Sequence, residues 1–209
     1  AAAAAAAAGD DVAPRIGVRI NPGEGSGHNK RTAVAGPNAS FGVWHEQLPA
    51  FVARAAQLGV KLTYAHHHVG SGGAPEKWLA MAEHLLSLVD KWLPDVTTVN
   101  LGGGFPVARV RGDSAGDVRA AASGARRLLA EFEQRTGRRL RLEVEPGSFI
   151  VANAGVLVAT VEDVVTTSAA TPFVKIDAGM SHIMRPALYG ALHPIAFVHR
   201  REPMAVSAC

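Results

Sequence analysis

The sequence has little cysteine, no long apolar run and no large excess of either charge. Its single cysteine, Cys209, excludes a disulfide within the chain and fits a reducing compartment. The 21 Lys and Arg nearly balance the 18 Asp and Glu, so we expect no nucleic-acid partner. No stretch approaches the roughly 20 continuous apolar residues of a membrane span, and we expect no membrane partner. These absences favour a cytoplasmic protein, with an organelle stroma as the alternative.

The composition that is present is typical of a globular protein. Hydrophobic residues make up 48% and charged residues 19% of the 209 positions, which is enough to bury a core. Single α/β-barrel domains have roughly 200 to 250 residues, so the length suits one such domain or most of one. Residues 1–14 begin with eight alanines and are interpreted as a low-complexity lead. Basic clusters around Arg126 and Arg138 are interpreted as solvated helix faces.

Short β-branched runs alternate with longer amphipathic stretches, a pattern typical of parallel βαβ units. Apolar residues at three- and four-residue spacing predict helices, and β-branched runs predict strands. The predicted helices cover 46–58, 75–92 and 117–136, and the predicted strands cover 16–20, 60–66, 96–101, 140–144, 156–165 and 173–176. Polar or glycine-rich clusters follow several of these strands. In an α/β barrel, this is the face where active sites are built.

Two glycine-rich turns each follow a predicted strand and precede a helix. They are Gly70-Ser71-Gly72-Gly73 and Gly102-Gly103-Gly104. Free amides at the start of a helix bind anions, so a phosphate is one interpretation. Neither turn has the Lys and Ser or Thr of a P-loop. Tight turns alone would also explain the glycines.

Three consecutive histidines, His66, His67 and His68, end a predicted strand. Neighbouring strand residues point to opposite faces, so His66 and His68 should share a face and His67 should point away. Zinc would need further ligands, and no HExxH or cysteine pattern supplies them. Three interpretations stay open: a satisfied buried histidine, a zinc ligand, and a ring stacked on an aromatic cofactor.

A carboxylate, Glu145, ends a predicted strand directly before Pro146 and Gly147. At the end of a barrel strand such a group is expected to be functional, and it can pair with the ring nitrogen of a pyridine cofactor. An ordinary ion pair with a nearby arginine is the alternative.

Six segments, taken together, resemble a known family. They are RIGVRINPG (15–23), SFGVW (40–44), HHHVGSGG (66–73), VNLGGGF (99–105), EVEPG (143–147) and VKIDAGMSHIMRPALYGALHP (174–194). Their order and spacing resemble those of the pyridoxal-phosphate-dependent amino-acid decarboxylases with the alanine racemase fold, especially the diaminopimelate type and its D-ornithine and D-lysine relatives. The resemblance implies an incomplete (β/α)8 TIM barrel of the alanine racemase type that runs into the start of a C-terminal β-domain.

The resemblance also implies roles for residues at the cofactor. His68 matches the histidine that stacks on the ring of pyridoxal 5'-phosphate. Glu145 matches the partner of the pyridinium nitrogen. Ser71 and the run Gly102–Gly104 match the phosphate cradle. We therefore expect these residues to bind the cofactor and His68 and Glu145 to be catalytic.

Other matches concern the substrate and a partner subunit. Arg185 and Tyr189 match groups that hold the substrate carboxylate and the cofactor side of the site. Cys209 resembles the cysteine that reaches a partner subunit's site, so we expect it to be catalytic in a homodimer. Asp177 begins the segment that leaves the barrel, where a structural role competes with a catalytic one.

The chain departs from the family pattern at two places within the site. The family's Schiff-base lysine lies on the first barrel strand, and Lys30, Lys61 and Lys175 lie outside the matching motif. Ser148 stands where the family usually has arginine, so a positive contact is expected to be lost or reassigned.

We therefore expect a partial copy of such an enzyme. Residues 1–14 would be the lead, 15–180 a partial barrel that binds pyridoxal phosphate, and 181–209 the truncated passage to the β-domain. The expected activity is decarboxylation of a small basic or diamino acid (diaminopimelate, ornithine or lysine type), as in lysine biosynthesis, with the chain inactive alone. The alternatives are a non-catalytic homologue that binds partners and, third, a zinc-dependent barrel hydrolase.

Overall fold

The computed structural model describes residues 15–25, 34–71, 74–167, 171–198 and 203–206. The chain divides into two compact units, residues 1–107 with 114–150, and residues 108–113 with 151–209. In the described part, none of the helices has the length and hydropathy to cross a membrane.

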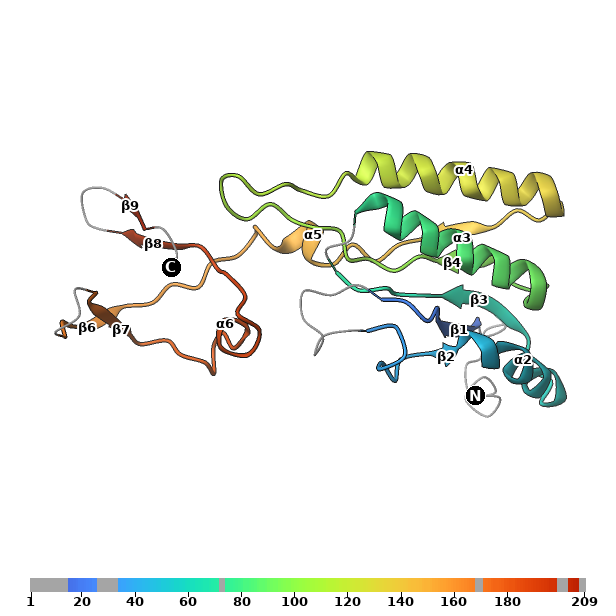
Figure 1. The fold of residues 1–209 in the computed structure, drawn as a ribbon, viewed down its shortest axis with the longest axis horizontal. Coiled ribbons are helices and arrows are strands. Elements are labelled where there is room, and N and C mark those ends of the chain that lie inside the picture. The colour runs from blue at the N-terminus through green and yellow to red at the C-terminus, as the bar shows by residue number, and fades with distance from the viewer. Residues whose placement is uncertain (1–14, 26–33, 72–73, 168–170, 199–202, 207–209) are drawn as a thin grey trace, which may run out of the picture. The chain divides into compact units, whose positions relative to one another are not determined.

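The first unit is an open α/β structure built on one parallel sheet. Its sheet has the order β2-β1-β3-β4-β5, with every neighbouring pair parallel. Figure 1 shows helices α3 and α4 side by side against this sheet. The elements are β1 (Ile16–Asn21), β2 (Val43–Trp44), the 3-10 turn η2 (His45–Gln47), α2 (Leu48–Gln57), β3 (Leu62–His66), α3 (Pro75–Trp92), β4 (Thr98–Asn100), α4 (Val118–Thr136) and β5 (Arg141–Glu143). The short helix α5 (Ser148–Val151) contains the division between the units.

The core lies between the sheet and its helices. Val18, Ala65 and Val99, one from each of three neighbouring strands, are buried and pack in one cluster with Leu85 of α3 and Phe132 of α4. Because side chains alternate along a strand, the residues between them point to the other face. Polar side chains occupy that other face.

One row of this polar face runs straight across the sheet. Arg19 pairs in register with His66, His66 with Asn100, and Asn100 with Glu143. In a parallel sheet, residues in register point to the same face and lie at the same height along the strands. The row therefore gathers polar groups near the carboxyl ends of four strands.

The predicted bounds of helices α3 and α4 are confirmed, because their end signals are local. Pro75 begins α3, where its missing amide hydrogen costs nothing. Asp117 caps α4 by accepting a hydrogen bond from the Ala120 amide at 2.9 Å, as expected for an N-cap. Gly137 ends α4 in the left-handed region with a φ of 69°.

One of the basic clusters has a structural role. The Arg138 guanidinium donates to the carbonyl oxygens of Leu93 at 2.8 Å and Val96 at 3.0 Å, and to that of Val89 at 3.4 Å. These carbonyls lie in the last turn of α3 or just beyond it, and those of Val89 and Leu93 also accept the amides of Leu93 and Val96. Arg138 thus adds side-chain donors at the end of this helix. The interpretation of Arg138 as part of a solvated face is therefore wrong.

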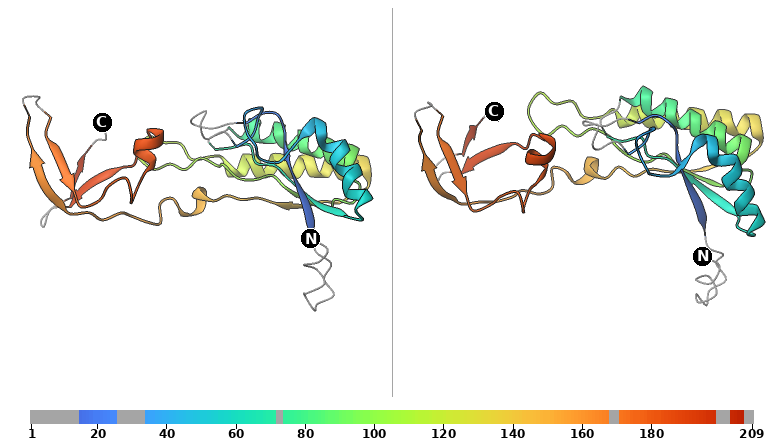
Figure 2. Two further views of the ribbon diagram at one scale, coloured as in Figure 1. Left: turned by 90° about the horizontal axis from the view of Figure 1, so that it is seen from below. Right: turned by 60° about the horizontal axis from the view of Figure 1, so that its bottom comes forward.

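The second unit contains two antiparallel ladders. Strand β6 (Val161–Val165) pairs with β7 (Phe173–Ile176), and β8 (Ile195–Val198) pairs with β9 (Pro203–Val206); both ladders are visible in Figure 2. Helix α6 (Arg185–Tyr189) lies between them in sequence. The sequence predicted 156–165 and 173–176 as strands of a parallel repeat, but the short connection between them permits a hairpin and not a crossover. All buried hydrophobic residues of the described chain belong to the first unit.

Candidate active site at the carboxyl ends of the strands

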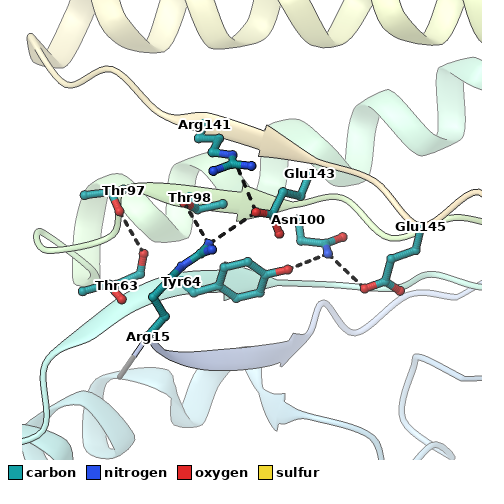
Figure 3. A network of polar contacts seen from close by, with 9 residues as sticks. All are labelled: Arg15, Thr63, Tyr64, Thr97, Thr98, Asn100, Arg141, Glu143 and Glu145. Carbon is teal, nitrogen blue, oxygen red and sulfur yellow. Dashed lines mark hydrogen bonds and ion pairs between the residues drawn. The ribbon is translucent and has the colours of Figure 1, made fainter. Parts of the chain in front are cut away.

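The ends of three neighbouring strands bring polar side chains together in the first unit. His66 ends β3, Asn100 ends β4, and Glu145 lies two residues after β5. The amide Nδ2 of Asn100 donates to Glu145 Oε1 at 2.9 Å, and His66 Nε2 lies 3.7 Å from the same oxygen. Figure 3 shows Asn100 pointing toward both Glu145 and Tyr64. Glu145 therefore lies within the predicted cluster at the strand ends.

Two arginines, one directly before β1 and one at the start of β5, pair with a different carboxylate. Arg15 Nη2 lies 3.3 Å and Arg141 Nε 3.7 Å from Glu143 Oε1, as Figure 3 shows. Among the described residues, no arginine forms an ion pair with Glu145. The alternative in which Glu145 is an ordinary partner of an arginine thus applies to its neighbour Glu143.

His68 is held by a glycine turn. Its Nδ1 accepts a hydrogen bond from the Gly103 amide at 3.2 Å, so the neutral ring carries its hydrogen on Nε2. Burial lowers the pKa of His68, with a further lowering by Arg19 that Glu145 opposes. The turn therefore fixes both the tautomer and the position of this ring.

His66 has a nitrogen without a partner in the cluster. Burial lowers its pKa, whereas the Glu145 carboxylate acts in the opposite direction. Its Nε2 is buried and has no hydrogen-bond partner in the described part of the chain, because 3.7 Å to Glu145 is too long for a hydrogen bond. A buried polar atom without a partner is unusual, and a polar ligand beside Glu145 would satisfy it.

His67 points away from the cluster, as the strand alternation predicts. It is 1% exposed, and both its ring nitrogens lack partners among the described residues. Burial, together with the neighbouring histidines and Arg19, lowers its pKa to about 3. The ring is therefore a buried neutral one, but its nitrogens have no hydrogen-bond partners among the described residues.

In the ranges that the structure describes, no group of three or more His, Cys, Asp or Glu could hold a metal ion.

The glycine turns interlock through their main chains. A Cβ on Gly103 would lie 1.7 Å from the carbonyl oxygen of Glu145, and one on Gly104 would lie 2.0 Å from that of Gly70. The amide of Gly102 donates to Asn100 Oδ1 at 2.8 Å, and that of Gly103 donates to His68. Close backbone packing thus requires glycine at these positions, and the amides of Gly102 and Gly103 are already used within the protein.

A small cavity lies behind these turns. It has a volume of about 20 Å³ and is lined by residues that include Gly70, Gly103, Gly104, Lys77 and Trp78. That volume holds about one water molecule. The cavity is therefore too small for a pyridine ring, and neither His68 nor Glu145 lines it.

The lysines considered in the sequence have other partners or lie outside the described residues. Lys61 Nζ pairs with Asp95 Oδ1 at 3.1 Å, and Lys175 Nζ pairs with Asp163 Oδ2 at 3.0 Å across the β6–β7 ladder. Lys30 lies outside the described residues. These observations give no reason to assign the role of the family's Schiff-base lysine to any of the three.

Most of the remaining predicted residues lie in the second unit or next to it in sequence. Arg185 and Tyr189 begin and end α6, and both are exposed. Asp177 Oδ1 accepts a hydrogen bond from the Thr160 amide at 2.8 Å, which is a structural role. Ser148 begins α5. Cys209, Gly72 and Gly73 lie outside the described residues.

Sequence reasoning assigned no role to Asn100, Tyr64 or Arg19. Asn100 Nδ2 donates to Tyr64 Oη at 2.5 Å as well as to Glu145. Arg19 lies close enough to lower the pKa of all three consecutive histidines. A polar residue inside the apolar run VNL, two positions before a glycine, was the signal available for Asn100.

Comparison with known proteins gives relatives of one kind. The model of the family described as "Pyridoxal-dependent decarboxylase, pyridoxal binding domain" matches residues 4–152. Diaminopimelate decarboxylase of Streptomyces coelicolor is 35% identical over 185 residues, which cover 87% of this chain and 41% of that protein. The enzyme of the same name from Escherichia coli strain K12 is 32% identical over 182 residues, with 87% and 43% covered.

Solved structures resemble the chain equally well. A crystal structure of diaminopimelate decarboxylase matches with a TM-score of 0.80 and 32% identity, over 87% of this chain and 43% of that one. Diaminopimelate decarboxylase from M. jannaschii, in co-complex with L-lysine, matches with a TM-score of 0.70 and 26% identity, over 86% and 42%. The chain thus spans less than half the length of these relatives. Its parallel α/β arrangement is that of the alanine racemase type, as predicted, and the chain belongs to the family of pyridoxal-dependent decarboxylases.

Proposed function

We propose that this chain forms the cofactor-binding framework of a pyridoxal-phosphate-dependent decarboxylase that acts on a basic or diamino acid of the diaminopimelate type. One observation carries the proposal. Glu145, after the end of β5, lies beside the unpartnered Nε2 of His66 at the end of β3, and His68, which follows β3, is fixed in one tautomer nearby. This face of the sheet offers a ligand a carboxylate, a neutral imidazole and an unused polar atom.

The chemistry of these groups fits the cofactor. When bound, pyridoxal phosphate supplies an electron sink for the electrons released as carbon dioxide leaves an amino acid. Glu145 would offer its carboxylate to the pyridinium nitrogen, and His68 would lie against the ring. The Ser71 hydroxyl and the Gly104 amide would hold the phosphate, because the amides of Gly102 and Gly103 donate elsewhere.

The relatives support this substrate class. The Streptomyces coelicolor and Escherichia coli relatives are diaminopimelate decarboxylases, and the M. jannaschii structure is a co-complex with L-lysine. Arg185 and Tyr189 would hold the substrate carboxylate and the cofactor side of the site, as the family resemblance implies. Pairing of two copies, a role of Cys209 at the partner's site and a cytoplasmic location stay predictions.

Binding of pyridoxamine 5'-phosphate to the full chain tests the cofactor site. This compound has the ring and the phosphate but no aldehyde, so it forms no imine with surface lysines. Its fluorescence should show saturable binding. Ser71→Ala should weaken binding about tenfold, because a hydrogen bond to a charged group is lost. The control Ser87→Ala, on the exposed side of α3, should leave binding unchanged. Absence of saturable binding would overturn the proposal.

A second variant separates the roles of the carboxylate. Glu145→Gln should keep most of the affinity for the cofactor, because the phosphate is held by other groups. A neutral amide cannot keep the ring nitrogen protonated, so turnover should fall far more than affinity. Release of carbon dioxide from diaminopimelate, ornithine or lysine, measured with the full gene product, checks this. Normal turnover with lost cofactor affinity would make Glu145 a binding residue instead.

A further inference from the structure

We propose that Asn100 is a positioning residue that sets the orientation of the Glu145 carboxylate. The inference rests on the proposed function, because it concerns the same site. Asn100 ends β4 and makes three side-chain hydrogen bonds: to Glu145, to Tyr64 and from Gly102. None of the roles assigned to the site so far involves this side chain.

The amide group of Asn100 can point in one way only. Its two Nδ2 hydrogens go to Glu145 Oε1 at 2.9 Å and Tyr64 Oη at 2.5 Å, and its Oδ1 accepts the Gly102 amide at 2.8 Å. With the amide reversed, its oxygen would face the carboxylate and its NH2 group would face the Gly102 N–H, so two bonds would become repulsions. The glycine turn therefore dictates that Asn100 presents a donor to Glu145.

Glu145 needs such a donor because its side chain is largely exposed. That side chain is 54% exposed, whereas Asn100 is 4% exposed. An exposed carboxylate samples several rotamers unless a partner holds it. Among the described residues, Asn100 is the group that donates a side-chain hydrogen bond to this carboxylate.

The main chain of Glu145 is held by the same turn. Its amide donates to the Gly102 carbonyl oxygen at 2.8 Å, and the Gly103 backbone packs against its carbonyl oxygen. Asn100 and the glycine turn thus fix both the backbone and the side chain of Glu145. A carboxylate fixed in this way is what a partner for a ring nitrogen requires.

Asn21 offers a matched control. Like Asn100, it is buried and ends a strand of the same sheet. Its side chain also holds a loop, with Nδ2 donating to Gly36 O at 3.0 Å and Oδ1 accepting the Gly36 amide at 2.9 Å. Within the described residues, no hydrogen bond joins its side chain to Glu145. Substitution of Asn21 therefore reports the cost of damaging a loop alone.

A double-mutant cycle without any ligand tests the contact. Asn100→Asp keeps the acceptor for Gly102 but sets a second carboxylate against Glu145, so it should raise the equilibrium constant for unfolding. Glu145→Gln should reverse that effect about tenfold, because its amide can donate to the new carboxylate. The same cycle with Asn21→Asp should be additive. Additivity of the Asn100 cycle within about twofold would overturn the proposal.

The function of the contact is read from pyridoxamine 5'-phosphate labelled with 15N in the ring and bound to the full chain. Its ring-nitrogen resonance, followed against pH, gives the pKa of that nitrogen. Asn100→Ser keeps an acceptor two residues before Gly102 but cannot reach Glu145. It should lower this pKa by about one unit, while Asn21→Ser should not change it. An unchanged pKa in Asn100→Ser would overturn the positioning role.

The two measurements also separate this inference from the proposed function. If the unmodified chain binds no pyridoxamine phosphate, the proposed function fails and the cycle alone decides whether Asn100 holds Glu145. If the compound binds but either the cycle or the pKa fails to respond to Asn100, the inference fails and the proposed function stands.

Discussion

Lowering the pH from 7 to 5 should destabilise the first unit by about 2 kcal/mol through His67 alone. This ring is 1% exposed and its nitrogens lack partners among the described residues. Burial is the largest cause that lowers its pKa from 6.5 to about 3, and His66, His68, His84 and Arg19 act in the same direction. The folded protein therefore keeps His67 neutral where the unfolded chain protonates it.

The sign and size follow from proton binding. Above pH 6.5 neither state binds the proton, so the full stability is present. Between pH 6.5 and about 3 only the unfolded state binds it, and the free energy of unfolding falls by about 1.4 kcal/mol per pH unit. At pH 5 this gives about 2 kcal/mol, and at pH 3 it gives about 5 kcal/mol. His66, His68 and His84 also have lowered pKa values and add to the total loss.

The contribution of His67 is isolated by the substitution His67→Leu. Urea unfolding followed by tryptophan fluorescence reports the first unit, because Trp44, Trp78 and Trp92 all lie in it. The difference in unfolding free energy between pH 7 and pH 5 should be about 2 kcal/mol smaller in the variant than in the unmodified chain. Val99→Ala, a buried change on the same side of the sheet, should destabilise equally at both pH values.

One result would refute this reasoning. If His67→Leu shows the same pH difference as the unmodified chain, the ring titrates alike in both states and is not buried as described. Such a variant would lose the same amount of stability at pH 7 and pH 5, as expected if the substitution only damages packing.

Three further changes should affect stability in a graded way, each measured by urea unfolding. Arg138→Ala should cost about 1 to 3 kcal/mol, because the hydrogen bonds from the charged guanidinium to three carbonyls at the end of α3 are lost; the neighbouring Arg139→Ala should cost little. Gly103→Ala should cost about 3 kcal/mol or more, because its Cβ would overlap a carbonyl oxygen, whereas Gly155→Ala has open space around it and should be tolerated. Asp117→Ala should cost about 1 kcal/mol through loss of the α4 cap, and a change above about 3 kcal/mol would point to a further role.

The parts of the fold that depend on neighbouring residues were predictable. Helix α3 has the predicted bounds, and α4 begins one residue after its predicted start, because Pro75, Asp117 and Gly137 act on the turn next to them. Strand β4 is shorter than the predicted 96–101, since pairing with both neighbours extends over three residues. The antiparallel pairing of β6 and β7 could not be deduced from strand-like composition, because composition does not give the direction of a partner strand.

The candidate site was predictable from chemistry and spacing, but not its internal hydrogen bonds. Alternation along the strand predicted that His67 points away from the cluster, and the ends of parallel strands predicted that Glu145 lies on the same edge of the sheet as His68. The donation from Asn100 to Glu145 joins residues 45 apart in sequence. Such a contact depends on the register between strands, which a single sequence with many apolar strands does not specify. The hydrogen bonds that the Gly102 and Gly103 amides donate to Asn100 and His68 could not be predicted for the same reason.

The direct contact between the glycine turns and the segment after β5 has a consequence for local opening. The main chains of these segments are in direct contact, with no side chains between them. The turn at Gly102–Gly104 therefore cannot open locally while the segment at Glu145 keeps its hydrogen bonds. The amide hydrogens of Gly102, Gly103 and Glu145 should therefore exchange with solvent together, as one cooperative unit. The backbone of Gly103 and Gly104 leaves no space for an added Cβ atom. Differences in what binds at this edge of the sheet must therefore come from changes in the surrounding side chains.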